Sequence, residues 1–267
     1  MKKLEEYIAE AYDTKSNKPT VQPKNKIELK KIIKDAFAHK QYDLNFIDTS
    51  KITDMQNLFE YCEHDFDVSS WDVSKVKYMS YIFYNCLKFK GKGLENWDVS
   101  NVTDMRFMFS GCDKFDCDLS RWDVSNVTYM NGIFSFCYKF EGKGLENWDV
   151  SAVNSMYAMF YNCKNFNVDL SQWNVSNVTD MHSMFTLCEN FKGKGLENWD
   201  VSNVTDMDSM FVNCKKFTGK GLENWNVSKV KTMRTMFNGC KFNYHELDWD
   251  LSGLSSQLKT FHNYLGN

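Results

Sequence analysis

Apolar residues recur along most of this chain with a period close to 25 residues. The tryptophans follow this period with spacings of 24 to 26 residues. They stand at Trp71, Trp97, Trp122, Trp148, Trp173, Trp199, Trp225 and Trp249. A fixed period of this size is typical of repeat proteins, in which each unit buries its apolar face against its neighbours. The pattern therefore predicts one elongated array rather than two globular domains.

Each unit begins with alternating apolar and polar positions. In the unit over residues 94–115, which reads LENWDVSNVTDMRFMFSGCDKF, Trp97 and Val99 alternate with Asp98 and Ser100. Strict alternation is the pattern of a strand with one buried face. We therefore expect a short strand, with the tryptophan and valine pointing into the core and the aspartate and serine pointing outward.

The second half of the unit has a different apolar spacing. Met105, Met108, Phe109 and Cys112 stand at positions i, i+3, i+4 and i+7, which is one face of an α-helix. Thr103 precedes this stripe and is a suitable N-cap. The other units keep the same spacing, which is better explained by core packing than by a cofactor site. The sequence therefore predicts a short helix in every unit.

Eight of the nine cysteines occupy one position of the repeat, 15 residues after the tryptophan or, in the first unit, after Ile47. They are Cys62, Cys86, Cys112, Cys137, Cys163, Cys188, Cys214 and Cys240. One register means one environment, and a buried cysteine behaves as a small apolar residue. The chain has no CxxC motif and no Cys/His pairing at zinc spacing. We therefore expect a column of buried, reduced thiols.

The loops that return to the next unit are of two kinds. The longer kind contains Gly-Lys-Gly and spans residues 89–97, 140–148, 191–199 and 217–225. The shorter kind spans residues 115–122 and 166–173. Gly-Lys-Gly lacks the GxxxxGK[ST] frame of a phosphate-binding loop and recurs four times. We therefore attribute the glycines to backbone turning rather than to phosphate binding.

Both ends of the chain depart from the repeat, because an uncovered terminal unit would expose core residues. Residues 25–40 predict an amphipathic helix, in which Asn25 and Glu28 form a capping box. We expect a further helix over residues 1–13. The predicted division is an N-terminal helical cap with a linker at 14–24, a repeat array, and a C-terminal capping helix, over residues 1–45, 46–250 and 251–267.

The repeat resembles a known family. Residues 166–188, FNVDLSQWNVSNVTDMHSMFTLC, are similar to the repeat of the DUF285 family of BspA-like, Mycoplasma lipoprotein-type surface proteins. The resemblance extends over residues ~46–250, and the L-x-x-W-x-V phrase is similar to the L-x-x-L-x-L of leucine-rich repeats. It implies an α/β solenoid, a right-handed leucine-rich-repeat-like array of short strand–short helix units with helical caps. It also implies adhesion or protein binding, often at a bacterial surface.

Composition and charge exclude several classes of function. The chain is 43% hydrophobic with a formal charge of −3, so we expect no nucleic-acid partner, and no apolar run is long enough to span a membrane. The first residues lack the apolar stretch of a signal peptide, which predicts a cytoplasmic protein, whereas the resemblance suggests a surface or secreted one. The five histidines do not recur in register, and no catalytic motif is present. We therefore expect neither an enzyme nor a cofactor.

The outward strand positions predict an acidic ladder. It comprises Asp72, Asp98, Asp123, Asp149 and Asp200. Like charges on neighbouring strands repel, so hydrogen bonds from local amides and serines, divalent cations or a basic partner must relieve them. We favour local hydrogen bonds over calcium, which needs six to eight oxygen ligands, and therefore predict no metal site.

The helix face that points to solvent varies from unit to unit, and five of its residues are aromatic. They are Tyr81, Tyr84, Phe107, Tyr157 and Tyr161. Aromatic side chains are common anchors of protein interfaces, although variation on a solvated face would explain them equally well. The sequence predicts a non-catalytic protein–protein interaction scaffold. The alternative is a cell-surface or secreted adhesin that binds a host protein or glycan, with or without calcium.

Overall fold

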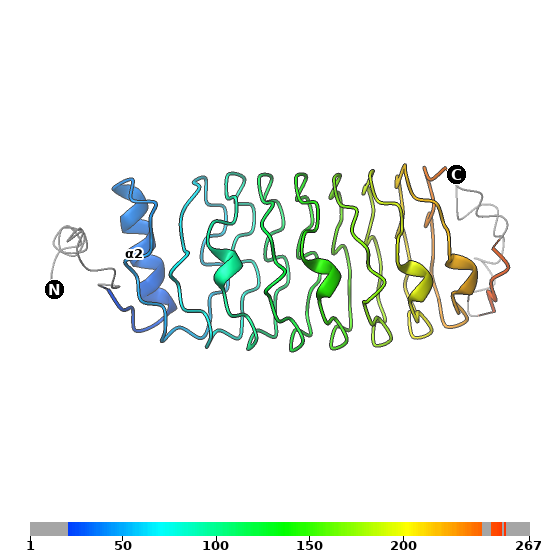
Figure 1. Ribbon diagram of the computed structural model, residues 1–267, viewed down its shortest axis with the longest axis horizontal. Coiled ribbons are helices and arrows are strands. Elements are labelled where there is room, and N and C mark those ends of the chain that lie inside the picture. The colour runs from blue at the N-terminus through cyan, green and yellow to red at the C-terminus, as the bar shows by residue number, and fades with distance from the viewer. Residues whose placement is uncertain (1–20, 242–246, 253, 255–267) are drawn as a thin grey trace.

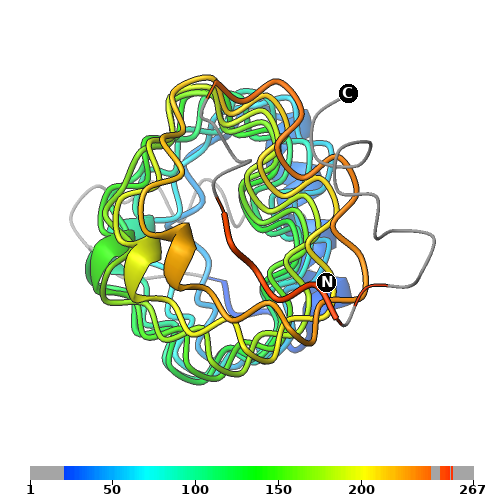
Figure 2. The same ribbon diagram turned by 90° about the vertical axis from the view of Figure 1, so that its right-hand side faces the viewer.

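The computed structural model describes residues 21–241, 247–252 and 254, which wind into coils stacked along one long axis (Figure 1). Viewed along that axis, the coils superpose into one ring (Figure 2). Isolated parallel bridges join successive coils at one position of the repeat. From the second coil onward they pair Asp54–Tyr78, Tyr78–Asp104, Asp104–Tyr129, Tyr129–Ser155, Ser155–Asp180, Asp180–Asp206 and Asp206–Thr232. One unit of the sequence repeat therefore makes one coil.

Turns replace the short helix that the sequence predicts in each unit. Residues 105–112 form three overlapping four-residue turns, closed by hydrogen bonds from Met108 N to Met105 O (3.2 Å), from Ser110 N to Phe107 O (3.3 Å) and from Cys112 N to Phe109 O (2.9 Å). Phe107 has a φ of 52°, which lies in the left-handed region and interrupts any right-handed helix. The prediction of a helix is therefore wrong for this unit and for its counterparts.

The backbone groups within these turns are divided between two kinds of partner. Met108 and Cys112 donate within their own coil, whereas Phe107 N and Phe109 N donate to Asn131 O and Ile133 O of the next coil, both at 2.9 Å. Alternate residues thus close turns and join coils. Because buried backbone donors need partners, this arrangement satisfies the segment without a helix.

The predicted strand is also absent, although its pattern of burial is correct. Residues 97–99 are extended but form no bridge to a neighbouring coil. Trp97 and Val99 are nevertheless buried while Asp98 is exposed. The chain turns directly afterwards, where Val102 N donates to Val99 O at 2.9 Å.

The tryptophan column makes a hydrogen bond that its apolar pattern does not reveal. Trp173 Nε1 donates to Leu145 O of the preceding coil at 2.8 Å. The other seven make the equivalent bond at 2.8 to 3.3 Å, from Trp71, Trp97, Trp122, Trp148, Trp199, Trp225 and Trp249. The indole therefore fills the core, and its buried N–H finds an acceptor on the preceding coil.

The cysteine column behaves in the same way. Cys163 Sγ donates to Phe134 O of the preceding coil at 2.9 Å. The same contact, at 2.9 to 3.0 Å, is made by Cys86, Cys112, Cys137, Cys188, Cys214 and Cys240. All nine cysteines are free, and burial raises the pKa of Cys240 to about 12. These thiols therefore stay protonated at neutral pH.

Helix α2, Lys26–Ala38, covers the amino-terminal end of the stack (Figure 1). Asn25 Oδ1 accepts from Glu28 N at 3.0 Å, and Glu28 Oε2 accepts from Lys24 N at 2.8 Å, so the two side chains cap the helix reciprocally. The helix expected over residues 1–13 and most of the one expected within 251–267 lie outside the described residues.

The longer return loops each contain one short 3₁₀ helix. These are η1 (Leu94–Asn96), η2 (Leu145–Asn147), η3 (Leu196–Asn198) and η4 (Leu222–Asn224). Gly144, just before η2, has a φ of 92°, and a Cβ placed on it would lie 2.2 Å from Ser120 N. Glycine is needed here for the turn and for the close approach of the shorter loop, as expected for Gly-Lys-Gly.

Candidate functional site

Three of the five predicted aromatic residues lie together on one side of the stack. The rings of Tyr81 and Phe107 are stacked with centroids 5.1 Å apart, and Tyr84 meets Tyr81 edge-on at 5.4 Å. Tyr61 extends this group, because its ring lies 5.5 Å from that of Tyr84. The four rings come from three successive coils and form one continuous contact chain.

The other two predicted residues belong to different ring pairs. Tyr161 contacts Phe136 at 5.1 Å, and Phe136 contacts Tyr138 at 6.4 Å. Tyr157 instead lies 5.3 Å from the ring of His182. We call the whole set the aromatic face, and it comprises Tyr61, Tyr81, Tyr84, Phe107, Phe136, Tyr138, Tyr157 and Tyr161.

Sequence reasoning missed Tyr61, Phe136 and Tyr138. Tyr61 and Phe136 lie in the segment that the sequence predicts to be helical, where they would not share a surface with Tyr84 and Tyr161. Tyr138 follows the cysteine at which the predicted apolar stripe ends. The turns bring them to the same side instead. Tyr61 and Phe136 are large side chains that stay open to solvent, with exposed fractions of 62% and 40%. A comparison of the unit positions around the cysteine column would have found them.

Four residues of the aromatic face have a left-handed backbone. The φ angles are 60° at Tyr61, 58° at Tyr81, 52° at Phe107 and 60° at Phe136. This conformation costs an ordinary L-residue roughly 1–2 kcal/mol, whereas glycine and asparagine adopt it readily. In other coils the position of Tyr61 and Phe136 holds Asn85, Gly111, Asn162, Asn213 and Gly239, and in one coil Leu187. The backbone alone therefore does not favour aromatic residues there.

The acidic ladder is exposed, and its carboxylates are capped locally. Asp98 Oδ1 accepts from Ser100 N at 3.1 Å and from Ser100 Oγ at 2.7 Å. Each of the others accepts from the amide of the serine two residues later at 3.0 Å, at Asp72, Asp123, Asp149 and Asp200. The serine hydrogen bonds lower the pKa of Asp149 and of Asp200. These hydrogen bonds relieve the repulsion between neighbouring carboxylates locally, as the sequence predicts.

A second acidic group lies near the aromatic face. One oxygen of Asp206, one of Asp208 and a ring nitrogen of His182 lie within 4.8 Å of one another, which is a spacing that a cation could use. Arg234 and Thr232 already bind Asp208, with Arg234 Nε and Nη2 donating to its Oδ2 at 2.8 and 2.6 Å. The guanidinium supplies the positive charge that a metal would otherwise bring to this carboxylate.

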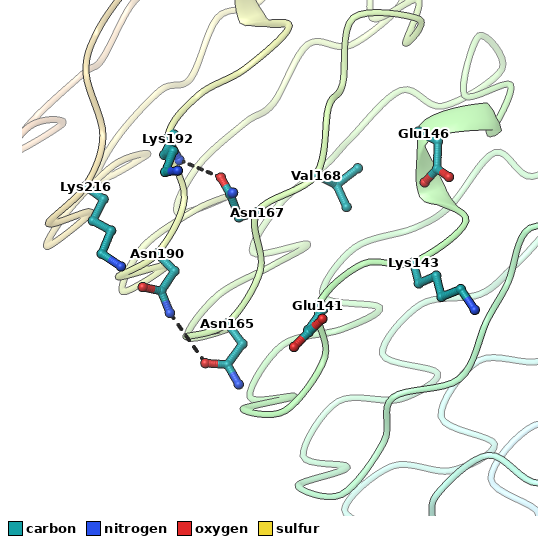
Figure 3. Close-up of a pocket in the computed structure, with 9 residues that line it drawn as sticks. All are labelled: Glu141, Lys143, Glu146, Asn165, Asn167, Val168, Asn190, Lys192 and Lys216. Carbon is teal, nitrogen blue, oxygen red and sulfur yellow. Dashed lines mark hydrogen bonds between the residues drawn. The ribbon is translucent and has the colours of Figure 1, made fainter.

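A groove opens between η2 and η3, where the shorter return loop leaves room (Figure 3). Its volume is about 630 Å³. Three lysines, three asparagines, two glutamates and one valine line it: Lys143, Lys192, Lys216, Asn165, Asn167, Asn190, Glu141, Glu146 and Val168. Asn167 Oδ1 accepts from Lys192 N at 3.1 Å, so the shorter loop is hydrogen-bonded to the longer loop of the next coil (Figure 3). Amides and ammonium groups suit binding of a polar ligand such as a sugar.

Comparisons with known proteins point to one family. A family model described as "Mycoplasma protein of unknown function, DUF285" matches three overlapping segments of the chain, residues 27–141, 82–194 and 179–265. No curated protein and no solved structure matches the chain. In the described part of the chain, no helix has the length and apolar character needed to cross a membrane.

Proposed function

We propose that this chain, which belongs to the DUF285 family of Mycoplasma proteins of unknown function, is a non-catalytic scaffold for binding a protein partner. The partner docks on the aromatic face. The observation that carries this proposal is the chain of ring contacts from Tyr61 through Tyr84 and Tyr81 to Phe107, in which Tyr61 is exposed and the other three rings are half-buried. Such rings supply large contact area at low cost in side-chain entropy.

The stacked coils suit this role because they hold the rings in fixed positions. Phe107 lies between the ring of Tyr81 and the backbone at Gly132, where a Cβ would come within 2.3 Å of its ring. A rigid, preorganised surface loses little freedom on binding, which favours affinity. A relationship to leucine-rich repeats, based on the L-x-x-W-x-V phrase, stays a prediction, as does the absence of catalysis.

An adhesin that binds a host protein or glycan is the second candidate. The groove between η2 and η3 favours it, because Asn167, Asn190 and Lys192 present amide and ammonium groups beside one apolar side chain, Val168. The surface location that the family resemblance suggests would suit this role. Calcium is a less favoured part of this alternative, since serine amides already cap the acidic ladder.

Alanine substitutions on the aromatic face test the main proposal. We expect Tyr81→Ala and Tyr157→Ala to weaken binding of a partner captured from cell lysate, identified by mass spectrometry and then purified. Losses of roughly tenfold or more are typical of aromatic anchors. Val212→Ala, which occupies the repeat position of Tyr84 in another coil, is the matched control. Unchanged affinity in both tyrosine variants would exclude the aromatic face as the binding surface.

A further inference from the structure

The rings with left-handed backbones are placed where they do little for the fold. Tyr61 and Phe136 combine a positive φ with exposed fractions of 62% and 40%, so burial compensates only in part for the strained backbone. Asparagine or glycine stands at the same position in five of the six other coils, and Leu187 stands there in the sixth. Their large, exposed rings are therefore better explained by contact with another molecule than by packing within this chain.

Exposed lysines border the aromatic face on four successive coils. They are Lys88, Lys114, Lys139 and Lys164, each one or two residues after a cysteine of the buried column. Among the described residues, none of the four forms an ion pair, and Lys164 Nζ lies 5.5 Å from the centre of the Tyr138 ring. In the turn segments 84–88, 107–114, 133–139 and 159–164, Asp113 is the single acidic residue, whereas in the first coil Glu60 and Glu63 lie close to Tyr61 in the sequence. The border is therefore positively charged over the four coils that carry these lysines.

Stacking brings these like charges close together. The phenylalanine rings of successive coils are 5.5 to 5.8 Å apart, and this distance indicates the separation of neighbouring coils. Ammonium groups that recur on successive coils repel one another, modestly while they are hydrated. A ligand with carboxylates at a similar spacing would relieve this repulsion. The attraction between opposite charges would also speed its association with this face.

We propose that the aromatic face binds an acidic protein segment, in which apolar side chains pack on the rings and carboxylates pair with Lys88, Lys114 and Lys139. This inference rests on the proposed function and adds the chemical class of the partner. The positive border distinguishes such a segment from a basic or neutral one, while the rings distinguish it from a purely ionic ligand. Exposed aromatic rings beside unpaired lysines recognise both features at once.

Selection of short random peptides displayed on phage, with the full chain as bait, tests the inference. We expect the selected peptides to be acidic and to contain aromatic or aliphatic residues. Their affinity should fall roughly tenfold in the variant K88Q/K114Q/K139Q, since three exposed charge pairs together contribute about that factor, and it should fall with added salt. The control K75Q/K77Q/K231Q removes the same charge from exposed lysines elsewhere and should bind normally.

Tyr61→Asn and Phe136→Asn separate binding from folding. Asparagine tolerates the left-handed backbone, so both variants should melt at the same or a higher temperature while they lose peptide affinity. A lower melting temperature in both would show that the rings serve the fold and would overturn the inference.

The remaining outcomes separate the two proposals. Peptides that need the rings but are not acidic, or that bind the triple lysine variant as well as its control, would overturn the acidic partner and leave the scaffold intact. Failure to select any peptide that depends on the rings would overturn both.

Discussion

At the scale of single residues, tryptophan and cysteine each do two things in this fold. Trp173 and Cys163 are buried, and each also donates a hydrogen bond to a carbonyl of the preceding coil, at Leu145 and Phe134. Each of these carbonyls also accepts from a backbone amide of its own coil, from Trp148 N at 3.1 Å and from Cys137 N at 3.0 Å. The indole and the thiol therefore add a second hydrogen bond that links the two coils, and such a bond contributes roughly 0.5–1.5 kcal/mol. Leucine or phenylalanine could fill the space but would lose this link.

Replacing Trp173 by phenylalanine tests this explanation. We expect Trp173→Phe to lower the free energy of unfolding by about 1–3 kcal/mol, because the hydrogen bond from the indole to Leu145 O is lost and the smaller ring leaves a cavity. Urea unfolding followed by circular dichroism measures the change. Gln172→Ala, at the exposed neighbouring residue, should unfold like the parent protein. A stability loss below about 0.5 kcal/mol in the phenylalanine variant would contradict the role of the indole donor.

At the scale of elements, ion pairs tie the longer return loops to the shorter ones. Lys143 Nζ lies 2.7 Å from Asp118 Oδ2, and Lys194 Nζ lies 2.7 Å from Asp169 Oδ2. The hydrogen bond from Lys143, followed by the one from Ser120 N, lowers the pKa of Asp118 to about 2. The same two kinds of contact lower the pKa of Asp169. These carboxylates stabilise the folded state only while they are ionised.

Acid should therefore weaken the fold. A carboxylate whose pKa is about 2 when folded and about 3.9 when unfolded contributes stability above pH 4, and this stability is lost as the pH falls toward 2. We expect the midpoint of urea unfolding to decrease over this interval. The variant Asp118→Asn should start from a lower midpoint at pH 6 and show a shallower decrease. Equal pH profiles for the two proteins would rule out the Lys143 pair as a source of acid sensitivity.

At the scale of the whole molecule, the coils share one core without disulfide bonds. The phenylalanine column runs from Phe59 to Phe237 with neighbouring rings 5.5 to 5.8 Å apart, and the cysteines are free thiols. The acidic ladder crosses the same coils on the outside, where serines cap it. We therefore expect the coils to stay stacked without disulfide formation and without a bound cation.

A thermal melt in reductant, with and without calcium, tests this conclusion. We expect a cooperative melt with the same midpoint in both conditions, because the ladder carboxylates already have hydrogen-bond donors. Calorimetry with a panel of soluble glycans tests, in addition, whether the groove between η2 and η3 binds a sugar. A large rise of the midpoint with calcium, or heat released by a glycan, would favour the adhesin instead of the protein scaffold.

By itself, the sequence determined the period, the family and the residues that are buried. It could do so because a core position needs the same residue type in every coil, so Trp173 and Cys163 have equivalents throughout. The sequence did not determine the backbone conformation between these buried positions. The spacing of Met105, Met108, Phe109 and Cys112 fits a helix and fits a series of overlapping turns equally well.

Only the tertiary structure decided between a helix and turns, because the turns depend on hydrogen bonds to the neighbouring coil. Phe107 N finds its acceptor at Asn131 O, 24 residues away in the sequence, and this bond exists only when the coils stack. The same stacking brings Tyr61 to Tyr84 and Phe136 to Tyr161, so the aromatic face could not be read from one unit. Burial follows from local pattern, whereas backbone pairing and surface clusters arise from contacts between coils.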